Sequence, residues 1–318
     1  MKTVLVTAIG TVTATAAVKR LKAAGGIRVI GADINERHEI ATSLDVDEFH
    51  KFPLAAEEDY IPFALDFCRA HRVDYYYAVI DGEVLQIARN RARFEAIGTK
   101  LCVADRAFVE ACHFKNAFGR WVAENMPEIA VREYRTLDEA RQAAFPLFIK
   151  PVEGVGSAGC RRVDSLEALK ATVDAGDIGK RLLVQEYVEG QNITVDCVRN
   201  RGTGQRQQVQ RRELLRNSNG CGIAVEIFRD PELERICDRL MEELDLNGVC
   251  NMEFFDTGSG YRIIEINPRL SAGTLYSCMA GVDTVLNAMR IADGEPCVFG
   301  EVATGARFAE RYEVYRMD

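Results

Sequence analysis

The sequence contains no long apolar run, no closely spaced cysteine pair and no excess of positive charge. Its 318 residues carry a formal net charge of −8, which argues against general nucleic-acid binding. No apolar stretch approaches the roughly 20 residues that span a bilayer, so no membrane association is expected. The chain opens with a strand-like run at 3–7 rather than the basic and then apolar layout of a secretory signal. These absences predict a cytoplasmic protein.

Cysteines and histidines are present, but their spacing is not typical of metal or redox sites. The ten cysteines are scattered singly, and C-x-x-C does not occur. Most lie among apolar residues, where a free thiol packs as a small hydrophobe, and a reducing compartment is expected. No histidine pair has metal-ligand spacing, so we interpret all four as surface or structural residues. They are His38, His50, His71 and His113.

Residues 1–112 alternate strand and helix signals, which predicts a parallel sheet covered by helices. We expect strands at 3–7, 28–33 and 75–80, and helices at 14–24, 60–70 and 83–96. The first strand-to-helix turn has one glycine, Gly10, where a dinucleotide fingerprint needs three. Asp33 ends the second strand as an acidic ribose ligand would, but the missing glycines disfavour NAD binding. We interpret this unit as a Rossmann-like scaffold put to another use.

Asp81 and Glu83 close the third expected strand at the carboxyl edge of this sheet. Ligands of open α/β sheets bind at that edge, so both carboxylates are candidates for binding the amino group of a substrate. The alternative is that Asp81 caps the following helix and matters only for stability.

A second group of oxygen-bearing residues lies near the end of the chain. The run 261–269 reads as a strand, and residues two apart on a strand share a face. Glu265 and Asn267 therefore project together, and Glu253 lies in an earlier strand-like run at 249–255. If the two runs pair, two carboxylates and one amide meet, a set of hard ligands that suits Mg²⁺. The alternative is an edge strand with solvated polar residues.

A glycine-rich loop follows an expected strand at 146–150. Gly154, Gly156 and Gly159 let backbone N–H groups turn toward an anion, and Ser157 lies among them. Lys150 precedes the loop and would place an ammonium on phosphates. A plain hairpin loop is the alternative, since no G-K-[ST] follows. The remaining expected elements are helices at 115–125, 165–175 and 231–244, and strands at 182–188, 193–199, 207–215, 250–255 and 261–267.

Four segments, in this order, resemble the ATP-grasp superfamily, and within it the carbamoyl-phosphate-synthetase-like branch of carboxylate–amine ligases. They are Phe145-Pro-Leu-Phe-Ile-Lys-Pro-Val-Glu-Gly-Val-Gly-Ser-Ala-Gly159, Val184-Gln-Glu-Tyr-Val-Glu-Gly190, Asn251-Met-Glu-Phe-Phe255 and Ile264-Glu-Ile-Asn-Pro-Arg-Leu-Ser-Ala-Gly273. The resemblance covers essentially the whole chain. It implies an α/β fold that is α+β in its C-terminal part. The implied domains are a Rossmann-like domain at 1–112, a lid subdomain at 113–188 and a C-terminal antiparallel-sheet subdomain at 189–318.

The resemblance also implies roles for individual residues. ATP would be bound by Lys115, Lys150, Glu153, Gly154, Gly156, Ser157, Gly159, Glu186, Tyr187, Val188 and Arg211, with the hinge strand at 186–188 reading adenine. Mg²⁺, or Mn²⁺ in its place, would be held by Glu253, Glu265 and Asn267. Arg269 would face the transferred phosphoryl group together with Lys150 and Arg212, although the resemblance does not show which of Arg211 and Arg212 reaches the phosphates. Ser271 and Gly273 belong to the loop expected to contact substrate.

Two positions depart from the family pattern. Asn192 stands where a ribose-binding glutamate is frequent, and its amide keeps hydrogen-bonding capacity. The turn at 8–11 has less glycine than related chains.

The implied activity is an ATP-dependent ligase that converts a substrate carboxylate to an acyl phosphate and joins it to an amine, releasing ADP and phosphate. Two alternatives remain, an enzyme that uses bicarbonate or carbamate and a non-catalytic ATP sensor on the same fold. An oxidoreductase is disfavoured. The expected partners are a small carboxylate and a small amine. Their identity, the pathway and the oligomeric state, with a homodimer as one option, are left open.

Overall fold

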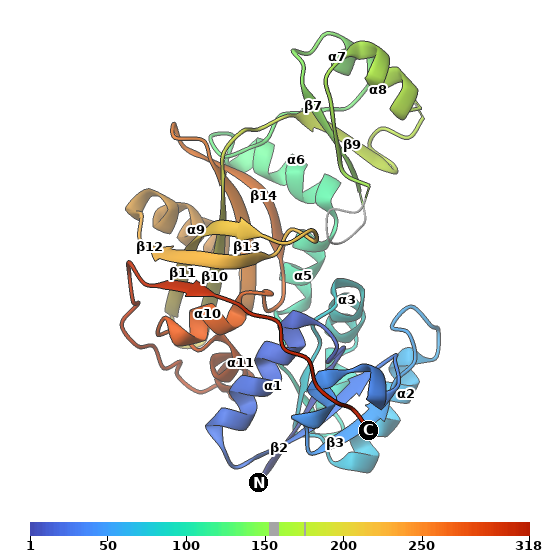
Figure 1. Cartoon of the computed structure of the whole chain (residues 1–318), viewed down its shortest axis with the longest axis vertical. Helices are drawn as coiled ribbons and strands as arrows, with labels where there is room; N and C mark the ends of the chain where they lie inside the picture. Colours follow the sequence, from blue (N-terminus) through green and yellow to red (C-terminus); the bar gives the residue numbers. More distant parts are fainter. Residues whose placement is uncertain (153–158, 175) are drawn as a thin grey trace.

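The computed structural model describes residues 1–152, 159–174 and 176–318, and over these residues the chain forms three β-sheets. Figure 1 shows an elongated molecule with the first sheet at one end, a small sheet at the other and the largest sheet between them. Within the described residues, no helix combines the length and apolarity needed to cross a membrane.

The first sheet is parallel, as the alternating pattern predicts, with strand order β3-β2-β1-β4-β5. Its strands are β1 Lys2–Thr7, β2 Ile27–Asp33, β3 Glu48–Lys51, β4 Tyr75–Tyr77 and β5 Lys100–Leu101, and its helices are α1 Val12–Ala24, α2 Tyr60–His71, α3 Asp81–Arg89 and α4 Arg91–Glu95. The third expected strand ends three residues early, and the helix expected at 83–96 is two helices that meet at Asn90.

The first strand-to-helix turn is held by Asp33. Its Oδ2 accepts a hydrogen bond from the Gly10 backbone N–H at 2.9 Å, and its Oδ1 accepts one from the Asn35 backbone N–H at 3.1 Å. This carboxylate organises the loop itself, which agrees with the interpretation of a Rossmann-like scaffold without a dinucleotide fingerprint.

The small sheet is antiparallel with order β6-β9-β7-β8. It contains β6 Glu133–Tyr134, β7 Leu147–Pro151, β8 Arg161–Val163 and β9 Leu182–Glu186, with α7 Leu137–Arg141 and α8 Leu166–Thr172 on it. Ser165 caps α8 as predicted, because its hydroxyl accepts from the Ala168 N–H at 3.2 Å. This unit has its own hydrophobic core, whose buried residues lie between Tyr134 and Val184 in the sequence. The preceding helix, α6 Lys115–Asn125, instead packs Phe118 and Val122 into a larger core.

The largest sheet is antiparallel, with order β14-β13-β10-β11-β12-β15. Its elements are β10 Gln191–Asn200, β11 Gln205–Arg216, β12 Gly222–Phe228, β13 Gly248–Asp256, β14 Tyr261–Asn267 and β15 Arg307–Ala309, with helices α9 Pro231–Glu243, α10 Thr274–Met279 and α11 Thr284–Asp293. β12, β15, α10 and α11 are not among the elements that the sequence predicts.

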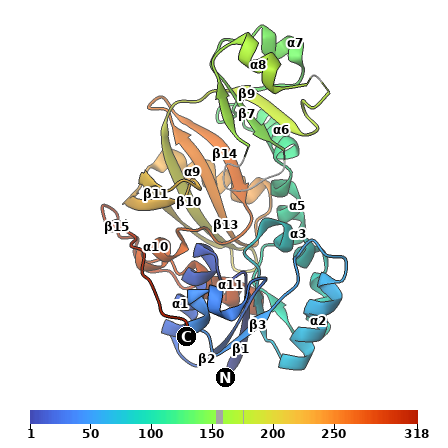
Figure 2. The ribbon, with the colours of Figure 1, turned by 45° about the vertical axis from the view of Figure 1, so that its right-hand side comes forward.

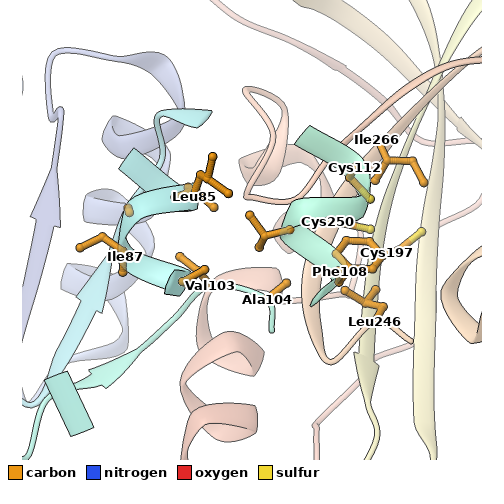
Figure 3. Close-up of a cluster of buried hydrophobic side chains, with 14 of the residues drawn as sticks. Leu85, Ile87, Val103, Ala104, Phe108, Cys112, Cys197, Leu246, Cys250 and Ile266 are labelled. Atoms are coloured by element: carbon orange, nitrogen blue, oxygen red, sulfur yellow. The ribbon is translucent and has the colours of Figure 1, made fainter. Parts of the chain in front are cut away.

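The first sheet and the largest sheet are joined by shared hydrophobic cores. In Figure 3, Phe108 and Cys112 of α5 Arg106–His113 lie beside Cys197 and Cys250 of the largest sheet, with Leu85 of α3 across from them. A second cluster joins α1 to α10 and α11, and Figure 2 shows α1 and α11 between the two units. These two units are therefore held together by a packed apolar interface.

Candidate functional site

The predicted pairing of the two C-terminal strands is present in the structure. β13 and β14 are antiparallel neighbours in which Glu253 lies opposite Glu265 and Asn251 lies opposite Asn267. The Asn267 amide nitrogen lies 3.1 Å from Glu253 Oε1 and 3.5 Å from Glu265 Oε1. Glu253, Glu265 and Asn267 thus meet on one face of the sheet, as expected.

The electrostatics of this group fit a divalent cation. Burial, with repulsion from Glu265 and Glu213, raises the pKa of Glu253 to about 7. Two carboxylates this close repel each other unless a proton or cation compensates them. The donor set is all oxygen, which suits Mg²⁺.

Two lysines lie near the same carboxylates, Lys115 at the start of α6 and Lys150 on β7. Lys115 Nζ forms an ion pair with Glu265 Oε2 at 2.9 Å, and Lys150 Nζ lies 3.5 Å from the Ile264 carbonyl oxygen. Burial lowers the pKa of Lys150, and attraction to Glu265 offsets this only in part. For Lys115, burial also opposes the charge, but Glu265 outweighs it and raises the pKa. Both ammonium groups are thus held near Glu265.

Arg269 connects this site to the first unit. Its Nε donates to Asp81 Oδ1 at 2.7 Å, a second nitrogen donates to Asp81 Oδ2 at 3.3 Å, and a weaker contact of 3.4 Å reaches Asn267 Oδ1. Asp81 is the first residue of α3, and the N-cap is Ile80, which makes no side-chain capping bond. The capping alternative for Asp81 is therefore wrong, and the carboxylate instead orients a guanidinium.

Of the two candidate arginines on β11, Arg211 faces the site. It is fully buried and forms an ion pair with Asp196 at 2.5 Å, while Ser271 and Ser277 accept further hydrogen bonds at 3.2 and 2.5 Å. Gly273 permits this packing, because a Cβ there would lie 3.0 Å from an Arg211 nitrogen.

Arg212 points to the other face, since neighbouring residues on a strand alternate. There it pairs with Glu226 at 2.9 Å and lies over the Phe228 ring. The prediction that Arg212 is catalytic is wrong for this geometric reason.

These groups surround a cavity of about 360 Å³ at the junction of the first unit and the largest sheet. Its polar lining includes Asp81, Lys115, Arg211, Glu253, Glu265, Asn267, Arg269, Ser271 and Gly273, all of them predicted site residues. It also includes Glu213, Arg216, Tyr276 and the loop at 219–222, which sequence reasoning missed. Period-two alternation from Arg211 would have found Glu213, because both lie on one face of β11.

Comparisons with known proteins agree with the family resemblance found in the sequence. A family model described as ATP-grasp in the biosynthetic pathway with Ter operon matches residues 179–314, and a PylC-like N-terminal domain model matches residues 4–102. The D-alanine–D-alanine ligase of Mycobacterium sp. strain KMS is 30% identical over 204 residues, which are 53% of this chain and 54% of the ligase. The chain belongs to the ATP-grasp superfamily.

Another relative is similar over a larger share of the chain, and solved structures share its fold. The carbamoyl phosphate synthase large chain of Agathobacter rectalis is 24% identical over 68% of this chain and 22% of its own length. The chain thus spans about half, or much less, of the curated relatives it matches. The biotin carboxylase of Campylobacter jejuni superimposes with a TM-score of 0.75 at 15% identity, covering 94% of this chain and 73% of that one. The N5-carboxyaminoimidazole ribonucleotide synthetase of Thermotoga maritima gives 0.65 at 17%, covering 95% and 78%.

The other predicted nucleotide residues of this ATP-grasp chain lie outside the cavity lining or outside the described residues. Glu153, Gly154, Gly156 and Ser157 belong to the undescribed stretch 153–158. Gly159 follows it with φ +76°, a left-handed conformation that favours glycine. Other predicted nucleotide residues are described but do not line the cavity, namely Lys150, Asn192 and the predicted hinge residues Glu186, Tyr187 and Val188. Asn192 Oδ1 accepts a hydrogen bond from Arg216 at 2.9 Å.

The prediction that Glu83 binds substrate is wrong. Glu83 is buried inside the first unit of this ATP-grasp chain, where its carboxyl accepts hydrogen bonds from Thr7 at 2.7 Å, from Tyr76 at 2.6 Å and from Tyr60. Residues 81 and 83 lie two positions apart in a helix, so they point in different directions. Glu83 faces the sheet, whereas Asp81 faces the cavity.

Glu83→Gln is expected to change the pH dependence of stability but not substrate binding. Burial raises the pKa of Glu83, so its favourable contribution exists at low pH and is lost as pH rises through the raised value. The free energy of unfolding of the variant, relative to wild type, should therefore be higher at pH 8 than at pH 5. Urea unfolding at both pH values measures this difference. The exposed Glu95→Gln is the control, and an equal difference at both pH values would contradict the assignment.

Proposed function

We propose that this ATP-grasp chain is an ADP-forming ligase that phosphorylates a substrate carboxylate and joins the resulting acyl group to an amine. The observation that carries the proposal is the meeting of Glu253, Glu265 and Asn267 beside Lys115 and Arg269 at the wall of a polar cavity. The relatives named as ligases and synthases support this class of reaction.

ATP and Mg²⁺ are the proposed cofactors. Glu253, Glu265 and Asn267 would hold the metal, with Mn²⁺ as a substitute, and its charge would offset that of the phosphates. Lys115 and Lys150 would exchange their present contacts near Glu265 for phosphate oxygens, and the hinge at 186–188 would hold the base.

Arg269 is the proposed catalytic cation for the transfer. Asp81 accepts hydrogen bonds from two nitrogens of its guanidinium, so the positive charge is oriented before substrate binds. Phosphoryl transfer depends mainly on positioning and on charges fixed in advance, and this arrangement supplies both. Asp81 is then a positioning residue, rather than the ammonium ligand that its place in the sequence predicts.

The reacting acid and amine would occupy the cavity beyond Arg269. Arg216 Nε and Glu213 Oε2 form an ion pair of 2.7 Å at this wall. Among the described residues this buried oxygen has that ion pair but no hydrogen bond of suitable geometry, and a carboxylate oxygen has two lone pairs, so it keeps capacity for another donor. We propose that Glu213 receives the amine and that Arg216 or Arg269 faces the carboxylate.

A phosphate-release screen with Mg-ATP and amino acids taken pairwise tests the proposed function. Bicarbonate with each single amine forms a separate arm. Release that requires both an acid and an amine supports the ligase. Release with bicarbonate and a single amine supports the carbamate alternative, and ATP binding without turnover in any arm would favour a sensor.

Asp81→Asn is expected to lower turnover by about 10- to 100-fold, because a misaligned Arg269 loses its fixed position. The Michaelis constants of both substrates should change far less than kcat. Steady-state kinetics on the best pair from the screen measure both quantities. Asp66→Asn, an exposed aspartate on α2, is the matched control. Unchanged kcat in Asp81→Asn would show that Arg269 does not need this partner.

A further inference from the structure

Two histidines and a glutamate meet on the first unit, on elements that do not line the cavity. Glu48 and His50 lie on β3, and His71 is the last residue of α2. One ligand atom from each of the three side chains lies within 4.8 Å of the other two. Figure 1 shows β3 and α2 at the end of the molecule away from β14.

Glu48 Oε1 is the shared centre of the group. His50 Nε2 lies 2.5 Å from this oxygen, and His71 Nδ1 lies 3.5 Å from it. Glu48 and His50 are two apart on a strand and therefore share a face, whereas His71 arrives from a helix 21 positions later in the chain. This is why inspection of histidine spacing alone did not reveal the group.

Aromatic packing fixes the two imidazole rings. Phe67 stacks on His71 with centroids 4.1 Å apart and an interplanar angle of 18°, and its ring meets His50 edge-on at 4.8 Å. Phe52 packs against Phe67 at 4.8 Å. The rings are thus oriented by an apolar support, which lowers the cost of ordering them around a ligand.

One neighbouring charge opposes cation binding. Arg28 pairs with Glu48, but it does so through Oε2, on the side away from the oxygen that the histidines share. Oε1 is therefore the carboxylate atom open to a cation, and Arg28 fixes the orientation of the carboxylate as a neighbouring donor does in built metal sites.

We propose that Glu48, His50 and His71 bind a divalent transition-metal ion, with Zn²⁺ as the best-fitting ion. Two imidazoles and one carboxylate are ligands that Zn²⁺ takes, leaving a fourth position for water or an external ligand. Bond lengths of about 2.0–2.1 Å imply that ligand atoms lie about 3.3 Å apart. The present distances from Glu48 Oε1, 2.5 Å to His50 Nε2 and 3.5 Å to His71 Nδ1, therefore require small shifts. The ion would link β3 to the end of α2.

The test uses the full chain after chelator treatment, with excess Mg²⁺ present to occupy the cleft carboxylates. Zn²⁺ is titrated by calorimetry, and Co²⁺ is added separately to read its visible ligand-field bands. We expect one Zn²⁺ per chain, and affinity at least about tenfold weaker in His50→Gln, His71→Gln and Glu48→Gln. His38→Gln and His113→Gln, which change the other two histidines, are the matched controls and should bind as wild type.

Thermal melting with and without Zn²⁺ distinguishes a loss of metal binding from a loss of folding. Zn²⁺ should raise the Tm of wild type and of the two controls but not that of the three site variants, since a ligand stabilises the state that binds it. Absence of one-to-one binding in wild type, or equal binding in the site and control variants, would overturn the proposal. Loss of ligase turnover has no bearing on this result, because the readouts are binding and melting.

Discussion

Glu265→Gln and Asn267→Ala are each expected to abolish ADP formation while the protein stays folded. Glu265 contacts Lys115 and faces Glu253, so it lies where two carboxylates would share one cation. Replacing it by an amide removes one of two anionic ligands, and truncating Asn267 removes the third oxygen. ADP release by the purified variants with Mg-ATP and the best substrate pair is the measurement.

Folding is expected to survive these changes, because loss of the Glu265 charge relieves the repulsion that raises the pKa of Glu253. Circular dichroism and thermal melting verify this. Glu226→Gln, on the opposite face of the sheet beside Arg212, is the matched control and should keep wild-type ADP release. Near-normal turnover in folded Glu265→Gln would remove the metal-site assignment.

Arg211→Met is expected to destabilise the protein by about 3–5 kcal/mol, the cost of leaving a buried charge without its partner. Asp196 would then be the uncompensated group, since Arg211 holds the pKa of that carboxyl below its usual value despite burial. The free energy of unfolding in urea measures the effect.

Arg212→Met is the natural comparison, because it changes the next residue on the same strand. Its ion pair with Glu226 is partly exposed, so the expected loss is about 1 kcal/mol or less. Asp196→Asn combined with Arg211→Met should recover part of the stability, since it removes the stranded charge. Similar losses for Arg211→Met and Arg212→Met would contradict the view that Arg211 is the buried partner of Asp196.

The sequence predicted those parts of the site that depend on strand alternation and strand pairing. Glu253, Glu265 and Asn267 could be placed on one face because a strand has a fixed period of two and the two runs pair. The same rule fails where the strand register is unknown, which is why Arg211 and Arg212 could not be separated before the β10–β11 pairing was seen.

Contacts between units were beyond sequence reasoning. Asp81 and Arg269 are 188 positions apart, and local patterns at either residue do not indicate the other. Glu83 was misplaced for a related reason: the strand at 75–80 was expected to be longer, so the start of α3 and the direction of the Glu83 carboxylate were wrong, whereas Asp81 lines the cavity as predicted. The buried group of Asp196, Ser271 and Ser277 also depends on packing of α10, a helix the sequence did not predict.

The shared cores have a consequence for recombining this chain with its relatives. A chimera cut near residue 112 would divide α5 from one of its two partners, exposing Phe108 and Cys112 on one fragment and Cys250 on the other. The small sheet has a separate core and is the better unit to exchange. A first unit transplanted into a relative would have to carry the matching surface of the largest sheet with it, because the two units share buried residues.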